Sequence, residues 1–183
     1  MPRSFSASRA PQRLENRLAA LRTLEWINIA WLAMLLLWWA PGWQQAPVPA
    51  GTWQRTLAFI PVAGLLAVGG WYWHRKLQQL RDHRSLQDAM PVLQRAGRYA
   101  RRTLTALTAA MVVSWTAAVG AAADRAWATL LILLAWAEYL NYFHVQLMHD
   151  TRSDLSRLRR TRRLRRSWLA SDLGEWQKSS RQT

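Results

Sequence analysis

The chain has 183 residues, of which 51% are apolar and 19% are charged, and its formal net charge is +15. This length is typical of a single domain. The absence of cysteine excludes a disulfide framework and a metal site with thiolate ligands. Apolar and charged residues occupy separate segments, whereas each helix of a soluble bundle would have a charged outer face. The composition therefore favours a membrane protein.

Four windows of the sequence are almost free of charge, and each is close to the roughly 20 residues of a bilayer crossing. They cover residues 26–40, 56–73, 103–123 and 126–146. We predict an all-α fold, a polytopic membrane protein with four transmembrane helices, a cytoplasmic helical hairpin and a basic C-terminal helix. The expected spans are about 24–40, 54–74, 103–122 and 126–148.

The basic residues predict how the chain is threaded. Five precede the first span, one lies in the first loop, eight lie between spans two and three, one lies in the third loop, and ten follow span four. This alternation is the positive-inside pattern, so both termini are expected in the cytoplasm. Arginine outnumbers lysine 23 to 2, which is associated with GC-rich bacterial genomes and favours the bacterial inner membrane. Glu25 and the long segment before it favour a retained first helix over a signal peptide.

The predicted parts follow in chain order. Residues 1–22 form a basic N-terminal segment, and 23–149 form the transmembrane bundle. Span two keeps its apolar spacing beyond the membrane, so that a cytoplasmic hairpin over 75–102 is expected. In this hairpin Asp88 is expected to cap the returning helix, with Pro91 in its first turn. The short loop before span four makes spans three and four antiparallel neighbours.

Span four carries an unusual number of polar side chains toward its cytoplasmic end, in "AEYLNYFHVQLMHD". Glu138 is expected near mid-bilayer, where an isolated charge costs about 3 kcal/mol or more and needs a partner. Span one has Glu25 and Asn28 at the matching depth, opposite His144 and Asn141. Span three offers Ser114 near the expected depth of Glu138. We interpret these groups as a polar seam that joins spans one, three and four: Glu25, Asn28, Ser114, Glu138, Asn141, Tyr142, His144 and Gln146.

Other functions compete with a structural seam. A metal site of the Glu-x-x-His type is disfavoured, because Glu138 and His144 are six residues apart. A haem site would have to use His74 and His149, both at the wet interface. A proton or ion pathway centred on Glu138 would need polar groups in the external half, where the spans offer little beyond Thr56 and Thr116. The prediction is therefore a non-enzymatic protein without metal or cofactor, with a small transporter as the alternative and a redox subunit as a further one.

The same segment resembles a known signature. Glu138, Tyr139, Asn141, Tyr142, Gln146, Leu147 and Asp150 match the C-terminal pattern of an uncharacterised family of small four-span bacterial inner-membrane proteins. The resemblance covers about 35 residues and implies architecture only. In that pattern an aromatic residue is expected where His149 stands.

The tail over 150–183 contains the densest run of charge, "RLRRTRRLRR". Because the run begins soon after span four, it is expected on the anionic cytoplasmic leaflet, where each arginine contributes about 1 kcal/mol of attraction. The residues expected to contact lipid are Arg157, Arg159, Arg160, Arg162, Arg163, Arg165 and Arg166. A protein partner or a homo-oligomer is expected as well, and nucleic acid is disfavoured because only charge supports it. The predicted function is a membrane-embedded scaffold or assembly factor whose cytoplasmic hairpin and tail contact anionic lipid and a protein partner.

Overall fold

The computed structural model describes residues 9–38, 52–147, 160 and 164–182. In these ranges the chain is helical and has no strand, only an isolated bridge between Val145 and Arg166. The elements are α1 (Arg9–Trp38), α2 (Thr52–Asp82), the short 3-10 helix η1 (Gln87–Ala89), α3 (Met90–Thr116), α4 (Ala122–Phe143) and α6 (Trp168–Ser179). The all-α prediction is confirmed for this part of the chain.

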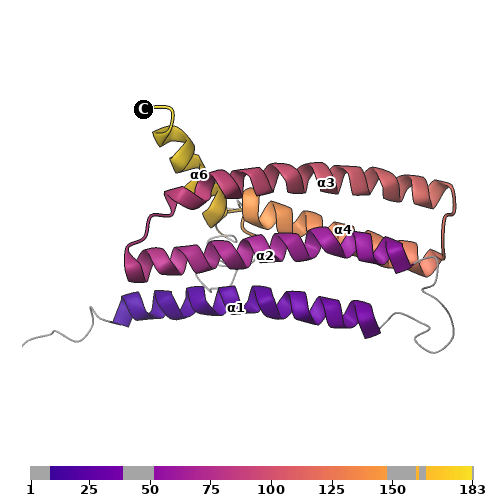
Figure 1. The fold of residues 1–183 in the computed structure, drawn as a ribbon, viewed down its shortest axis with the longest axis horizontal. Coiled ribbons are helices and arrows are strands. Elements are labelled where there is room, and N and C mark those ends of the chain that lie inside the picture. The colour runs from indigo at the N-terminus through magenta and orange to yellow at the C-terminus, as the bar shows by residue number, and fades with distance from the viewer. Residues whose placement is uncertain (1–8, 39–51, 148–159, 161–163, 183) are drawn as a thin grey trace, which may run out of the picture.

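The four long helices lie side by side in an elongated bundle (Figure 1). α1 packs on α2, α2 packs on α4, and α4 also packs on α3. Successive long helices run in opposite directions. α1 and α3 therefore begin at the end of the bundle that carries α6, and the connection between α2 and α3 lies at the same end. We call this the α6 end, and we call the opposite end, where α3 turns into α4, the far end.

α2 runs without interruption from Thr52 to Asp82, in agreement with its apolar spacing, and it includes Pro61. The connection to α3 differs from the prediction. Ala89, not Asp88, is the N-cap of α3, and it makes no side-chain capping bond. Asp88 lies one residue earlier, in η1, while Pro91 does occupy the first turn of α3, where its missing N–H leaves no helical bond unmade.

α3 and α4 are antiparallel neighbours, as the short loop predicts. The Trp115 indole N–H donates to the Thr129 hydroxyl at 3.0 Å, and the Trp136 indole N–H donates to the Thr108 hydroxyl at 3.0 Å. The turn between the helices contains Gly120 with a φ of 76°, a left-handed conformation that glycine adopts without strain.

The buried apolar core has three parts along the bundle. At the α6 end, α1, α2, η1, α3, α4 and α6 all contribute to one cluster. The middle cluster contains Val62, Leu65 and Leu104, and the cluster nearest the far end contains Ala58, Ala128 and Ile132. The predicted hairpin therefore does not project alone, because α1 and α6 cover it.

Two helices in the described part are long and apolar enough to cross a membrane, over Leu14–Leu37 in α1 and Trp53–Asp82 in α2. This statement rests on length and composition. Large apolar side chains are exposed on all four long helices, and Trp31, Ile60, Val113 and Leu133 are each more than half exposed.

The prediction for the end of span four needs correction, whereas most of the expected basic helix lies outside the described residues and Arg160, which is described, is helical. α4 ends at Phe143 with His144 as its C-cap, although the span was expected to continue to 148. The described C-terminal helix, α6, contains no arginine. The arginines Arg165 and Arg166 precede it in a non-helical stretch, so α6 is not the basic helix that the sequence predicts.

Candidate functional site

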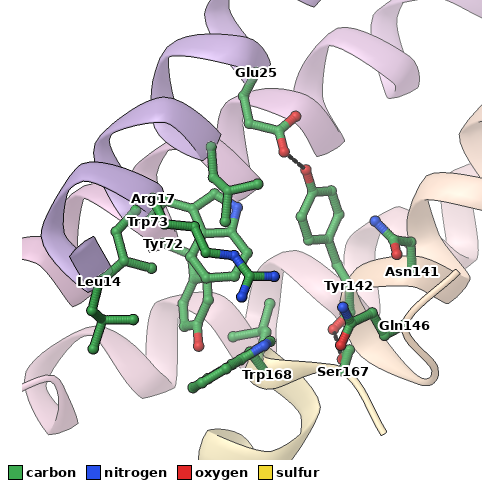
Figure 2. Close-up of a pocket in the computed structure, with 13 residues that line it drawn as sticks. Leu14, Arg17, Glu25, Tyr72, Trp73, Asn141, Tyr142, Gln146, Ser167 and Trp168 are labelled. Atoms are coloured by element: carbon green, nitrogen blue, oxygen red, sulfur yellow. Dashed lines mark hydrogen bonds between the residues drawn. The ribbon is translucent and has the colours of Figure 1, made fainter. Parts of the chain in front are cut away.

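A pocket of about 60 Å³ opens at the α6 end of the bundle, between α1, α2, α4 and the chain leading into α6 (Figure 2). Its walls are mostly apolar, with Glu25 and Tyr142 facing one another across one side. The lining residues are Leu14, Arg17, Leu18, Leu21, Glu25, Tyr72, Trp73, Asn141, Tyr142, Gln146, Ser167, Trp168 and Leu169. Four of the eight predicted seam residues are among them.

The Tyr142 hydroxyl donates a hydrogen bond to the Glu25 carboxylate, and this bond joins α4 to α1 (Figure 2). Gly69 on α2 makes the geometry possible, since a Cβ at this position would lie 2.2 Å from the tyrosine oxygen. The Trp73 side chain on α2 interacts with the same carboxylate. A single acidic group is thus held by two neighbouring helices.

Glu138 lies one turn before Tyr142 on α4 and is partly buried. Asn141 is its hydrogen-bonding neighbour. The charge of Glu138 also acts on Glu25 and on Tyr142. The structure therefore brings the two carboxyl groups of the predicted seam into one electrostatic cluster, with Tyr142 between α1 and α4 as the bridging group.

α4 ends at this site because the chain before α6 replaces its next turn. The backbone N–H of Gln146 donates to the Arg165 carbonyl at 2.8 Å, and that of Ser167 donates to the His144 carbonyl at 3.2 Å. The Asn141 side-chain oxygen accepts from the Leu147 N–H at 2.9 Å. His144 is exposed at this point, and its ring packs 5.3 Å from that of Tyr139. These bonds satisfy backbone groups that a helix end leaves open.

Ser167 connects the pocket to α6. Its hydroxyl donates to the Tyr142 carbonyl and accepts from the Ala170 N–H at 3.1 Å, so it caps α6 while it holds the end of α4. A serine at this position is a favoured N-cap. Beyond it, Leu169 and Leu173 are buried in the core cluster of the α6 end.

One carboxylate fixes the orientation of α6 on α2. Asp172 accepts from the Tyr72 hydroxyl and from the Lys76 ammonium, each at 2.7 Å. All three side chains are at least partly buried, which shields this pair more than a surface ion pair. Sequence patterning missed the contact, because Asp172 stands about 100 residues from its partners.

Two predicted seam residues lie elsewhere. Ser114 is at the far end, where its hydroxyl accepts from the Gln54 amide at 2.8 Å. Ser114 does not lie near Glu138, because α3 ends at Thr116 and not near residue 122 as expected, and the neighbouring Trp115 bonds to Thr129 in the first half of α4. Asn28 is exposed on α1, and no hydrogen bond joins it to another residue in the described part of the chain.

The far end has its own buried polar cluster, which sequence reasoning missed. Arg55 on α2 forms an ion pair with Asp124 at the start of α4. Arg125 donates to the carbonyls of Val119 and Gly120, at 3.2 and 2.7 Å. A signal was present in the sequence, because the two loops expected outside carry one arginine each and an aspartate beside the second.

Of the seven tail arginines expected on lipid, Arg160, Arg165 and Arg166 lie within the described residues, and all three are exposed. Arg165 lies over the Trp168 ring at 5.2 Å. Arg166 lies against α6, since a Cβ at Gly174 would be 3.0 Å from its guanidinium. The four others (Arg157, Arg159, Arg162 and Arg163) and His149 lie outside the described residues.

Within the described ranges no group of three or more His, Cys, Asp or Glu side chains could hold a metal ion. Comparisons with protein-family models, with curated proteins and with solved structures find no match for this chain. The chemistry of the site therefore rests on its own geometry. A carboxylate, a phenol, an indole and a second carboxyl group share a small, mostly apolar pocket, and each polar group that bonds does so to another part of the protein.

Proposed function

We propose that the chain is a multi-pass inner-membrane protein in which α1, α2, α3 and α4 each cross the bilayer. The observation that carries this proposal is that every one of the four helices exposes large apolar side chains, among them Met34, Ile60, Val113 and Leu133. Soluble monomers rarely expose apolar patches beyond a few hundred Å². A bilayer around the bundle would cover all of these side chains at once.

The distribution of charge supports an orientation with the α6 end in the cytoplasm. At the far end, Arg55 and Arg125 are both buried and both bonded to protein groups. At the α6 end, by contrast, Arg84, Arg95 and Arg166 are exposed. Exposed arginine at one end only is what the positive-inside rule requires of the cytoplasmic side. The resemblance of segment 138–150 to four-span bacterial proteins belongs to the same proposal.

For the activity, we propose a non-enzymatic scaffold or assembly role, in which the α6 end contacts anionic lipid and a protein partner or a second copy. The polar groups of the pocket are used to hold the protein together. Glu25 binds Tyr142, Asp172 binds Tyr72, and Ser167 binds the end of α4. Because these groups form hydrogen bonds within the protein, they hold α1, α4 and α6 in a fixed arrangement. A surface that binds a partner requires such a rigid arrangement.

Cysteine labelling tests the topology directly, because the natural chain contains no cysteine. We would introduce Ser85→Cys, Ala121→Cys and Gln182→Cys one at a time, since all three positions are exposed and lie in connections or near the chain end. A maleimide that cannot cross membranes should label only residue 121 in intact spheroplasts, and all three after lysis. Labelling of residue 182 from outside would overturn the proposed orientation.

A second candidate is a proton-coupled component centred on Glu138. The observation that favours it is the electrostatic contact between Glu138 and Glu25, since paired carboxyl groups occur in proton relays. The described core between this pair and the far-end cluster is apolar, with Val62, Leu104 and Ile132 in its centre. This arrangement places a barrier between the two polar regions, and we therefore rank this candidate second.

A further inference from the structure

A second pocket of about 350 Å³ lies on the outer face of α3, away from the site at the end of α4. Three arginines and one tyrosine line it: Arg95, Arg98, Tyr99 and Arg102. All four side chains are exposed, and Tyr99 is 66% exposed although it is a large aromatic residue. This surface is distinct from the tail arginines that the sequence singles out.

Helical spacing explains why these side chains gather. Residues three, four and seven apart share one face of a helix, so the four side chains form a single stripe about 10 Å long. The opposite face of α3 carries the buried residues Leu93, Gly97 and Leu104. At Gly97 the helix approaches α4 so closely that a Cβ would lie 2.6 Å from the Phe143 ring. The stripe consequently points away from the bundle.

In the described part of the chain, no acidic side chain forms an ion pair with the arginines of this stripe. Two other basic residues at this end form ion pairs, Lys76 with Asp172 and Arg81 with Glu15. Neither an ion pair nor a hydrogen bond joins the side chains of Arg95, Arg98 or Arg102 to another residue in the ranges that the structure describes. Three guanidinium groups thus remain available around one concave surface.

The position along α3 indicates the ligand. Arg102 directly precedes the charge-free window that starts at residue 103, so under the proposed topology it lies where the hydrocarbon ends. The three arginines then occupy the headgroup layer, and Tyr99 lies at the depth where tyrosine is enriched. Guanidinium groups bind phosphate oxygens in pairs of hydrogen bonds, and a phenol adds a further donor.

We propose that Arg95, Arg98, Tyr99 and Arg102 form a binding site for the phosphate group of an anionic phospholipid. The inference rests on the proposed membrane topology and deepens it, because it assigns the general lipid contact of the hairpin to four particular side chains and to the phosphate group. A solvated charged face would bind lipid in proportion to its net charge, whichever arginines carried it. A specific phosphate site would instead depend on these four side chains.

The test compares two variants that lose the same charge. The site variant is Arg95→Gln/Arg98→Gln/Arg102→Gln, and the control is Arg84→Gln/Arg101→Gln/Arg181→Gln, whose arginines are also exposed but line no part of this pocket. Native mass spectrometry of the full chain in detergent would measure binding of phosphatidylglycerol and of phosphatidylcholine. A parallel titration with glycerol 3-phosphate would measure binding of the soluble phosphate ester.

We expect the natural chain to prefer phosphatidylglycerol and the site variant to lose about 100-fold in affinity, since the charge-assisted hydrogen bonds of each arginine to a bound phosphate contribute at least about a fivefold factor. The control should lose less than about threefold. Loss of both phosphatidylglycerol and glycerol 3-phosphate binding in the site variant would support the phosphate site, whereas site-dependent binding of glycerol 3-phosphate alone would identify a soluble ester as the ligand and overturn the lipid assignment. Equal losses in both variants, or none in the site variant, would overturn the proposal. Labelling of residues 85 and 121 tests the membrane topology independently. A failure of the proposed topology can therefore be distinguished from a failure of the proposed phosphate site.

Discussion

Gly69 is the position where a single added methyl group should most clearly disturb the α1–α4 contact. It lies on α2 against the Tyr142 ring, and a Cβ there would be 2.2 Å from the tyrosine oxygen and 2.3 Å from the ring carbon that bears it. In Gly69→Ala the oxygen has to move by about 1.2 Å, the difference between that distance and an ordinary contact of 3.4 Å. We expect a shift of this size to break or weaken the hydrogen bond to Glu25.

Three contributions set the size of the effect. Overpacking of a filled core costs about 1–3 kcal/mol. Loss of the Tyr142–Glu25 hydrogen bond adds about 0.6 kcal/mol, and rarely more than about 2, for a bond between membrane helices. The replacement of glycine by alanine within a helix returns about 0.5–1 kcal/mol. The net expectation for Gly69→Ala is a loss of about 1–4 kcal/mol.

The assay is thermal unfolding of the detergent-purified protein, followed by circular dichroism. Gly64→Ala is the matched control, since it lies on the same helix and a Cβ there meets nothing within 4 Å. It should unfold at the same temperature as the natural chain or at a slightly higher one, whereas Gly69→Ala should unfold at a lower temperature.

A double-mutant cycle decides whether the loss comes from this contact. With the ring removed in Tyr142→Ala, the added methyl group of Gly69→Ala has space, so its cost should shrink by at least about 1 kcal/mol. The reasoning is refuted if Gly69→Ala melts like Gly64→Ala, or if it costs the same in both backgrounds.

Three further changes probe other parts of the molecule. Glu138→Gln should accumulate and unfold at almost the normal temperature, because the amide keeps the hydrogen-bonding capacity. Glu138→Lys should be far less stable in the same assay. A Gln variant that is stable but inactive in a phenotypic assay would favour the proton-coupled candidate. Asp172→Asn should weaken the hold on α6, so that limited proteolysis releases the C-terminal segment several times faster, and an unchanged rate would show that apolar packing alone retains the helix. Asp124→Ala should destabilise the protein by about 3–5 kcal/mol by leaving Arg55 buried without its charged partner, and Arg55→Met/Asp124→Leu should recover most of that loss; a double variant as unstable as the single one would contradict this.

The local spacing of apolar residues and the loop lengths predicted the helices well. The contacts between residues far apart in the sequence were not predicted. The apolar spacing of α2 carries it to Asp82, and the short loop makes α3 and α4 neighbours. Both features depend on residues close together in the chain. Ser114 was expected near Glu138, but α3 ends at Thr116 and not near residue 122, so Ser114 lies at the far end beside Gln54.

The polar seam was predicted in part. Glu25 was expected to meet α4 at the α6 end, and it does, but its partner is Tyr142 rather than His144. The difference arises because α4 ends at Phe143, so His144 leaves the helical face and becomes exposed. That ending depends on two backbone hydrogen bonds, from the Gln146 N–H to the Arg165 carbonyl and from the Ser167 N–H to the His144 carbonyl, which join segments about 20 residues apart in the chain. Helical periodicity contains no information about such a contact.

Tyr142 joins the segment before α6 to α1, because its backbone and its side chain each form a hydrogen bond to a different part of the protein. Its backbone carbonyl accepts from Ser167, the residue that caps α6, and its side-chain hydroxyl donates to Glu25. A displacement of α6 that removes Ser167 frees the last turn of α4, and with it the backbone that orients the tyrosine ring. The position of α1 and the docking of α6 are therefore linked through Tyr142, in addition to the core cluster that Leu18 of α1 shares with Leu169 and Leu173 of α6. In the scaffold that we propose, this link would couple a partner bound at the α6 end to the position of α1.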